Sequence, residues 1–344
     1  MTSPRALLLA FAIALLPAVP PAAAEDVLRV LSWSNYFPPA TIEEFQKEAG
    51  CRIEFLYYES NEELQERITS GLLGIDVVVP SDYMVRIMKR QNQLAALDHA
   101  RLPNLKNLDP RFRKLAFDPP NRFSIPYAWG TTGIGVNRAR VGAKFDSLSI
   151  LFDPAYKGQI MMLDDARACL GFALRKLGKS ANSRIKADLA AAKALLLEQK
   201  PLVRGYSGSL YVKALSEGTV LVCMGYSGDV LRARKENSAI SYAVPQEGTI
   251  LWVDNLCILE ACSQRELAHQ FLDFQMRPGI GARLTTELFY GTPNAAAEAS
   301  LPAGLRGDRA IFPGKSLLDK CEFLEDLGSF EQNYLDAWKE VRGE

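Results

Sequence analysis

Ile75-Asp76-Val77-Val78-Val79, followed by Pro80-Ser81, is the stretch that decides the fold. Four of its five side chains are apolar and most are β-branched, which is typical of a parallel strand covered on both faces. Pro80 ends the run, and Asp82-Tyr83-Met84 enters a helix. The sequence therefore predicts a buried, mainly parallel sheet built around this strand.

The segments before it repeat the same alternation of strand and helix. The predicted elements are strands at residues 28–33 and 52–58, and helices at residues 38–50 and 60–70. Proline at the start and Gly50 at the end delimit the first helix. Ser60 and Glu63 form a capping box that opens the second. A strand–helix series of this kind predicts an α/β domain.

The later chain predicts a second α/β domain and two strands that cross between the domains. Residues 124–136 form the first crossing, and the second lies within residues 240–258. Between them we expect strands at 158–163 and 219–224 and helices at 187–199 and 211–216, with a peripheral amphipathic helix at 330–342. The predicted limits are residues 25–131 plus 253–300 for the first lobe and 132–252 plus 301–344 for the second.

Residues 1–24 resemble a secretory signal peptide: a basic start, an apolar run over 6–16, and Ala22-Ala23-Ala24 before Glu25. No later apolar stretch is long enough to span a bilayer. Without Arg5 the chain has 39 basic and 40 acidic residues, a balance that argues against a nucleic-acid or membrane-surface binder. We expect an exported protein of two domains, located in the periplasm of a bacterium with two membranes.

Six cysteines are compatible with up to three disulfides in an oxidising compartment. They are Cys51, Cys169, Cys223, Cys257, Cys262 and Cys321, and the sequence does not decide whether any of them pair. A disulfide scaffold is not expected, because a chain of this length builds a core without one. Cys223 and Cys257 lie in apolar runs and are predicted to be small buried hydrophobes.

Trp252 and Asp254 lie two residues apart in the second crossing strand, so both side chains are on one face. An indole ring beside a carboxylate is a receptor for an organic cation, because the ring quadrupole and the carboxylate both attract positive charge. The alternative is a half-buried core tryptophan and an aspartate that opens a turn.

Loops at the carboxyl ends of the predicted strands hold further aromatic, hydroxyl and acidic side chains, where ligands of α/β sheets bind. These are Trp33, Ser34, Tyr36, Ser81, Tyr83, Asp165, Tyr226 and Asp229, and a turn near Phe289 brings Tyr290 to the same rim. The alternatives are local: Ser34 and Ser81 could cap helices, and Asp229 could be an N-cap. Of Asp164 and Asp165, one could cap a helix while its neighbour faces the cleft.

Catalytic and cofactor motifs are weak or missing. The chain has two histidines, His99 and His269, without metal-binding spacing, and no P-loop. Residues 205–208 fail the GxSxG pattern, and residues 279–281 lack the third glycine of a dinucleotide loop. We expect no enzyme, no cofactor and no metal. Two aspartates in a cleft could still serve a glycosidase.

Eight stretches, in order, resemble the spermidine/putrescine-binding proteins of bacterial ABC importers. They are Leu31-Ser32-Trp33-Ser34-Asn35-Tyr36, Tyr58-Glu59-Ser60-Asn61-Glu62, Val78-Val79-Pro80-Ser81-Asp82-Tyr83, Ser124-Ile125-Pro126-Tyr127-Ala128-Trp129-Gly130, Leu163-Asp164-Asp165-Ala166-Arg167, Tyr226-Ser227-Gly228-Asp229, Trp252-Val253-Asp254 and Tyr290-Gly291-Thr292-Pro293-Asn294.

The resemblance implies a type II periplasmic binding protein: two α/β lobes, joined by two crossing strands, that close on a ligand. It assigns the aromatic walls to Trp33, Tyr36, Tyr83, Tyr226 and Trp252, and the polar contacts to Ser34, Ser81, Asp165, Asp229, Asp254 and Tyr290. It also implies a polyamine ligand, an ABC permease as partner, and a monomeric protein that binds no nucleic acid.

Some positions depart from the family pattern. Ala168 and Leu324 stand where a spermidine binder has glutamate and glutamine, Asn35 replaces an acidic residue, Gly208 a serine, and Tyr226 a tryptophan. Asp229 matches the putrescine-binding branch. These differences favour a diamine such as putrescine over spermidine. A binder of another organic cation or amino acid, or a sensor without a transport role, is the alternative.

Overall fold

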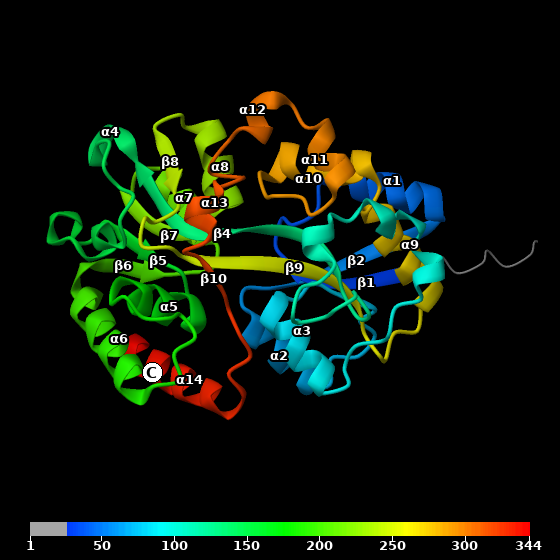
Figure 1. Ribbon diagram of the computed structural model, residues 1–344, viewed down its shortest axis with the longest axis horizontal. Helices are drawn as coiled ribbons and strands as arrows, with labels where there is room; N and C mark the ends of the chain where they lie inside the picture. Colours follow the sequence, from blue (N-terminus) through cyan, green and yellow to red (C-terminus); the bar gives the residue numbers. More distant parts are fainter. Residues whose placement is uncertain (1–25) are drawn as a thin grey trace, which may run out of the picture.

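The computed structural model describes residues 26–344, so the predicted signal peptide lies outside the described residues. Figure 1 shows two lobes side by side, with two long strands running from one to the other. We call the part around β1 (Asp26–Trp33) to β3 (Val77–Val78) the first lobe and the part around β5 (Ile160–Met162) to β8 (Ile240–Ala243) the second lobe. Within residues 26–344, no helix is long and apolar enough to cross a membrane.

The first lobe has a parallel core in the order β2–β1–β3. Its strands are β1 (Asp26–Trp33), β2 (Cys51–Tyr58) and β3 (Val77–Val78), and its helices are α1 (Pro39–Ala49), α2 (Asn61–Thr69) and α3 (Asp82–Arg90). β3 is shorter than the five residues predicted. The amides of Asp76 and Val79 still donate to β1 carbonyls, so the segment stays extended beyond the regular ladder.

The predicted helix ends are confirmed in this lobe. Pro38 and Gly50 cap α1, with Gly50 in the left-handed conformation at φ 63°. The Ser60 hydroxyl accepts from the Glu63 amide at 3.1 Å. The Glu63 carboxylate in turn accepts from the Glu59 amide at 2.8 Å, so the capping box reaches one residue further back than expected.

Two long strands join the lobes, as predicted. β4 (Ile125–Asn137) and β9 (Ile250–Ile258) pair antiparallel between Ile125 and Thr131. The other end of β9 pairs with β3, and the other end of β4 pairs with β7 (Val222–Tyr226), so a single sheet path passes through both lobes. The two strands run through the centre of the molecule, between the lobes (Figure 1).

The second lobe repeats the parallel arrangement, with β5 between β6 and β7. Its strands are β5 (Ile160–Met162), β6 (Val203–Tyr206), β7 (Val222–Tyr226) and β8 (Ile240–Ala243), and its helices are α4 (Arg138–Val141), α5 (Ala166–Lys176), α6 (Lys186–Gln199), α7 (Leu210–Ser216) and α8 (Ser227–Glu236). α14 (Glu331–Arg342), the predicted terminal helix, packs on α5 and α6.

The remaining elements lie between and around the lobes. They are α9 (Arg265–Gln275), α10 (Pro278–Leu288), α11 (Ala295–Ser300), α12 (Ala303–Arg306), α13 (Lys315–Leu318), β10 (Glu322–Phe323), which pairs with β9, and 3₁₀ turns at 99–101, 103–107, 110–112, 148–152, 154–156, 200–202 and 328–330.

Each lobe has its own hydrophobic core. The core of the second lobe includes Ile134, Met162, Leu170 and Cys223, while the first lobe has separate clusters around Phe271 and around Met84. Cys223 and Cys257 are fully buried thiols, as expected of small hydrophobes. The predicted residue limits of the two lobes stay a prediction.

Candidate functional site

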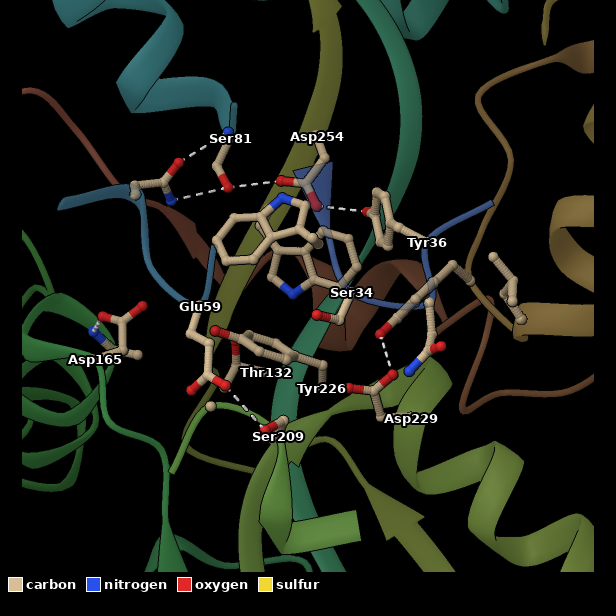
Figure 2. Close-up of a pocket in the computed structure, with 18 of the residues that line it drawn as sticks. Ser34, Tyr36, Glu59, Ser81, Thr132, Asp165, Ser209, Tyr226, Asp229 and Asp254 are labelled. Atoms are coloured by element: carbon tan, nitrogen blue, oxygen red, sulfur yellow. Dashed lines mark hydrogen bonds between the residues drawn. The ribbon is translucent and has the colours of Figure 1, made fainter. Parts of the chain in front are cut away.

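A cavity of about 490 Å³ lies between the lobes, within the size range of small-molecule sites. All eleven residues predicted for the site line it: Trp33, Ser34, Tyr36, Ser81, Tyr83, Asp165, Tyr226, Asp229, Trp252, Asp254 and Tyr290. Figure 2 shows side chains from both lobes directed into this cavity. The structure therefore brings the predicted residues together.

Asp254 lies in the middle of β9 at one end of the cavity and is 5 % exposed. Its Oδ1 accepts from the Ser81 hydroxyl at 2.6 Å, and its Oδ2 accepts from the Tyr36 hydroxyl at 2.5 Å (Figure 2). Burial raises the pKa of Asp254 to about 6, although both hydrogen bonds lower it. The alternative that Asp254 opens a turn is wrong.

The Ser81 side chain donates its hydrogen bond to Asp254 and does not cap a helix. It occupies the N-cap position of α3, yet its side chain makes no capping hydrogen bond. Asn61, at the start of α2, fixes it from the other side: its amide nitrogen donates to the Ser81 hydroxyl at 3.1 Å, and its oxygen accepts from the Ser81 amide. The alternative of a capping role is therefore wrong for Ser81. It is also wrong for Ser34, since α1 is capped by Pro38.

Asp82 is a second buried carboxyl group beside Asp254. It accepts from the amides of Tyr83 at 2.7 Å and Val253 at 3.2 Å. Burial raises its pKa to about 8, with the charge of Asp254 adding to the shift and the two amides opposing it. Near neutral pH, Asp82 is thus largely protonated and Asp254 is the charged member of the pair.

Aromatic rings from both lobes wall the cavity. The Trp252 indole meets Tyr226 edge-on at 5.9 Å and Tyr290 at 5.2 Å between ring centroids. Trp33 packs on Tyr58 at 4.4 Å and is fixed by its indole N–H, which donates to the Val79 carbonyl at 3.0 Å. The core alternative for Trp252 is partly right, because the ring is buried in the first-lobe cluster while also lining the cavity.

Gly130 in β4 makes room for this wall. A Cβ atom at this position would lie 2.6 Å from the Trp252 ring and 2.8 Å from the Ser227 hydroxyl. Real Cβ atoms do not approach other atoms so closely, so any larger residue would push the indole out of place. The glycine sets the position of Trp252 through backbone proximity.

Asp229 differs from Asp254 because a cation of the protein pairs with it. It accepts from the Tyr211 hydroxyl at 2.5 Å and the Tyr290 hydroxyl at 2.6 Å, and it forms an ion pair with Arg232. The N-cap alternative is wrong, since Tyr226 caps α8 and Asp229 sits in its first turn. Arg232 also lines the cavity, and the sequence prediction missed it. Its three-residue spacing from Asp229 on a helix was the available signal.

Asp165 lies at a third side of the cavity. Its Oδ1 caps α5 by accepting from the Ala168 amide at 2.8 Å, and the same side chain lines the cavity. The predicted division of roles with Asp164 holds in part, because Asp165 caps the helix and Asp164 lines an adjoining cavity, together with Ser34. Asp164 also pairs with Arg342 at 2.7 Å. One carboxylate oxygen suffices for the cap, so Asp165 fills both roles. Burial raises its pKa.

Two glutamates lie near Asp165. Glu62 accepts from the Tyr83 hydroxyl at 3.0 Å, and its pKa is raised to about 7 by burial and then by the Asp165 charge. Glu59, which the sequence analysis did not assign, lines the cavity and accepts from the Ser209 hydroxyl at 3.2 Å (Figure 2). This contact joins the two lobes.

The positions that depart from the family pattern also line the cavity: Asn35, Ala168, Gly208, Tyr226 and Leu324. Ala168 and Leu324 make their part of the wall apolar. Thr132 and Ser209 are further lining residues that sequence analysis did not single out. Within residues 26–344, no cluster of three or more histidine, cysteine or acidic side chains could hold a metal ion.

Two α/β lobes, two crossing strands and a cavity walled by both lobes define the class of protein: a two-lobe, type II solute-binding protein. The family model for a bacterial extracellular solute-binding protein matches residues 40–306. The chain belongs to this family, and the predicted fold class and family are confirmed.

Similar proteins cover nearly the whole chain. The spermidine/putrescine-binding periplasmic protein of Salmonella typhimurium is 33% identical over 98% of both chains. The putrescine/cadaverine-binding protein of Pseudomonas aeruginosa is 32% identical over 93% of this chain and 95% of its own. A solved structure of a putative spermidine/putrescine ABC transporter from Listeria monocytogenes has a TM-score of 0.88 and 35% identity, covering 92% of this chain and 99% of its own.

Proposed function

We propose that this protein captures a polyamine between its lobes and delivers it to the permease of an ABC importer. The observation that carries the proposal is the state of Asp254. This buried carboxylate receives hydrogen bonds from two hydroxyls, and within residues 26–344 no salt bridge to it is formed. A buried negative charge without a cation is costly, and a ligand ammonium offsets that cost.

The surrounding rings suit the rest of such a ligand. Methylene groups gain contact and dispersion energy against the indoles of Trp33 and Trp252, and an ammonium near a ring face is attracted by about 0.5 to 2 kcal/mol. Closure of the lobes removes water, which strengthens the interaction of the ammonium with Asp254. Both effects favour a flexible alkyl amine.

Within the polyamines we propose a preference for a diamine such as putrescine over spermidine. Ala168 and Leu324 give the wall two apolar side chains where the spermidine binders that this chain resembles have glutamate and glutamine. Without these two polar side chains, a third amino group placed there would lose partners that the spermidine binders supply, and its desolvation would cost more free energy. The Pseudomonas aeruginosa relative, a putrescine/cadaverine-binding protein, supports a diamine.

The relatives' names also support the setting. The Salmonella typhimurium relative is named a periplasmic protein and the Listeria monocytogenes structure an ABC transporter, so we propose a periplasmic location for this chain, with the permease of an ABC importer as partner. We propose that it is monomeric, binds no nucleic acid and catalyses no reaction. Recovery of a bound amine chemically unchanged would test the last point.

The deciding experiment is titration calorimetry of ligand-free protein with putrescine, cadaverine and spermidine. We expect saturable binding at one site per chain and a lower Kd for putrescine than for spermidine. Clearly tighter spermidine binding would refute the diamine preference alone. Absence of binding for all three amines would refute the polyamine function.

A further inference from the structure

We infer that Arg232 is a specificity-determining residue that competes with the second ammonium of a diamine for Asp229. This inference rests on the proposed function, since it concerns how the same cavity ranks amines. Among the described residues that line the cavity, Asp229 and Arg232 are joined as an ion pair, whereas Asp254 is not paired with a cation.

The contacts of Arg232 hold its guanidinium at the cavity wall. One Nη donates to Asp229, and the other donates to the Asn35 carbonyl of the first lobe at 3.5 Å. The guanidinium carbon lies 5.9 Å from the centre of the Tyr290 ring. Its side chain is 27% exposed, so the group is largely withdrawn from solvent but not sealed in.

Asp229 has little capacity left for a ligand. Its Oδ2 accepts from Tyr211, and its Oδ1 accepts from both Tyr290 and Arg232. The two tyrosine hydroxyls are neutral donors and leave the carboxylate charge in place. Arg232 supplies the opposing charge. A ligand ammonium therefore gains at Asp229 only the difference between its own pairing and that of the guanidinium it displaces.

Helix geometry explains why this arginine points into the cavity. Residues three apart lie on one face of a helix, so Asp229 and Arg232 are neighbours on α8. Arg234, two residues further on, lies on a different face and pairs with Asp308 at 2.6 Å. Arg234 does not line the cavity, which makes it a matched control on the same helix.

The test compares putrescine with 1-butylamine, which has the same carbon chain and one ammonium, on wild type, Arg232→Gln and Arg234→Gln. Glutamine keeps a hydrogen-bond donor for Asp229 but removes the charge. We expect the ratio of putrescine to butylamine affinity to rise at least fivefold in Arg232→Gln and to stay within twofold in Arg234→Gln. Thermal melts of the ligand-free variants show that each is folded.

A second measurement follows the displacement of the Arg232 guanidinium from Asp229 directly in the wild type. The Nε–Hε resonance of Arg232, assigned by its loss in Arg232→Gln, should shift on addition of putrescine and move little with butylamine. A purely structural ion pair would give the same response to both amines. The inference is overturned by equal responses, or by an affinity ratio that is unchanged or falls in Arg232→Gln.

Two results separate this inference from the proposed function. If wild type binds putrescine and the ratio does not change, the inference fails and the polyamine function stands. If neither protein binds any amine, both fail. Tighter wild-type binding of 4-aminobutyrate than of putrescine, lost in Arg232→Gln, would also overturn it, because Arg232 would then be a donor to a ligand carboxylate.

Discussion

Asp254 and Asp229 are both aspartates at two ends of one cavity, but only Asp229 is paired with a cation of the protein. Asp254 projects from a crossing strand and receives hydrogen bonds from two hydroxyls. Asp229 projects from the first turn of α8, accepts hydrogen bonds from two hydroxyls and forms an ion pair with a guanidinium. The negative charge is thus left for the solute at one end and is neutralised at the other.

The difference teaches that counting carboxylates around a cavity does not give its charge. Asp82, beside Asp254, is held largely protonated by burial near neutral pH. Asp229 is balanced by Arg232. Of these three aspartates, Asp254 therefore supplies most of the negative charge. Substitutions around the cavity should therefore differ in their effect on binding, with the largest loss at Asp254.

Replacing Asp254 with asparagine should abolish most binding. Loss of the charge leaves the ligand ammonium desolvated and unpaired, which costs about 2 to 5 kcal/mol, so putrescine affinity should fall at least ~30-fold. Calorimetry at pH 7.5 measures the change, with Asp308→Asn, which breaks an ion pair away from the cavity, as control. A loss below threefold would remove Asp254 from the site.

Acidification should weaken putrescine binding through the same carboxyl group. The pKa of Asp254 is raised to about 6, so the group is charged at pH 7.5 and mostly protonated at pH 5. Binding at pH 5 must release that proton, and affinity should fall about tenfold over this range. Calorimetry in buffers of different ionisation enthalpy counts the proton.

The Asp254→Asn variant is the control for this pH effect. Glu62, with a pKa of about 7, and Asp82, with a pKa of about 8, titrate in the same region. If the variant keeps the full pH dependence, these groups cause it and Asp254 does not. A flat profile in the variant would attribute the effect to Asp254.

Ser81→Ala should weaken the Asp254 end without removing its charge. The hydroxyl donates to Oδ1 at 2.6 Å, so its loss raises the pKa of Asp254 and frees the carboxylate to rotate. We expect affinity at pH 7.5 to fall about fivefold, near 1 kcal/mol, and the acid midpoint of binding to move to higher pH.

Ser70→Ala is the matched control for Ser81→Ala, because the Ser70 hydroxyl donates to the Arg67 carbonyl of α2 and Ser70 does not line the cavity. An acid midpoint that stays in place in Ser81→Ala would show that Ser81 does not tune Asp254. The Asp254 and Asp229 ends of the cavity would then differ less in charge than the structure indicates.

Glu59→Gln should have the smallest effect. This carboxylate is exposed and holds the Ser209 hydroxyl across the cleft at 3.2 Å. Charges at such positions contribute less than about 1 kcal/mol and are screened by salt, so we expect a roughly twofold loss at low salt that vanishes at ~0.5 M. A loss above tenfold at both salt concentrations would place Glu59 in direct contact with the ligand.

Sequence predicted the cavity residues well because they follow one local rule. Trp33, Ser81 and Tyr226 stand at the carboxyl ends of predicted strands, and such ends gather on one rim. Trp252 and Asp254 share a face of an extended strand, which their spacing alone establishes. The structure places all of these side chains around one cavity.

What the sequence did not predict depends on packing between distant segments. The spacing of Asp229 and Arg232 predicts an ion pair, but not that it faces the cavity. The high pKa of Asp82 arises from burial against β9, 171 residues away along the chain. The dual role of Asp165 depends on how α5 sits against the first lobe. None of these follows from a local pattern.

The hydrogen bond from the Tyr290 hydroxyl to Asp229 has a consequence for the empty protein. Tyr290 packs in the first-lobe core, and Asp229 belongs to α8 of the second lobe, so this bond links the two lobes through groups of the protein alone. A hydrogen bond of this kind lowers the free energy of the closed conformation independently of the ligand. Less of the ligand's binding free energy is then spent on closing the lobes, and part of the measured affinity comes from contacts within the protein.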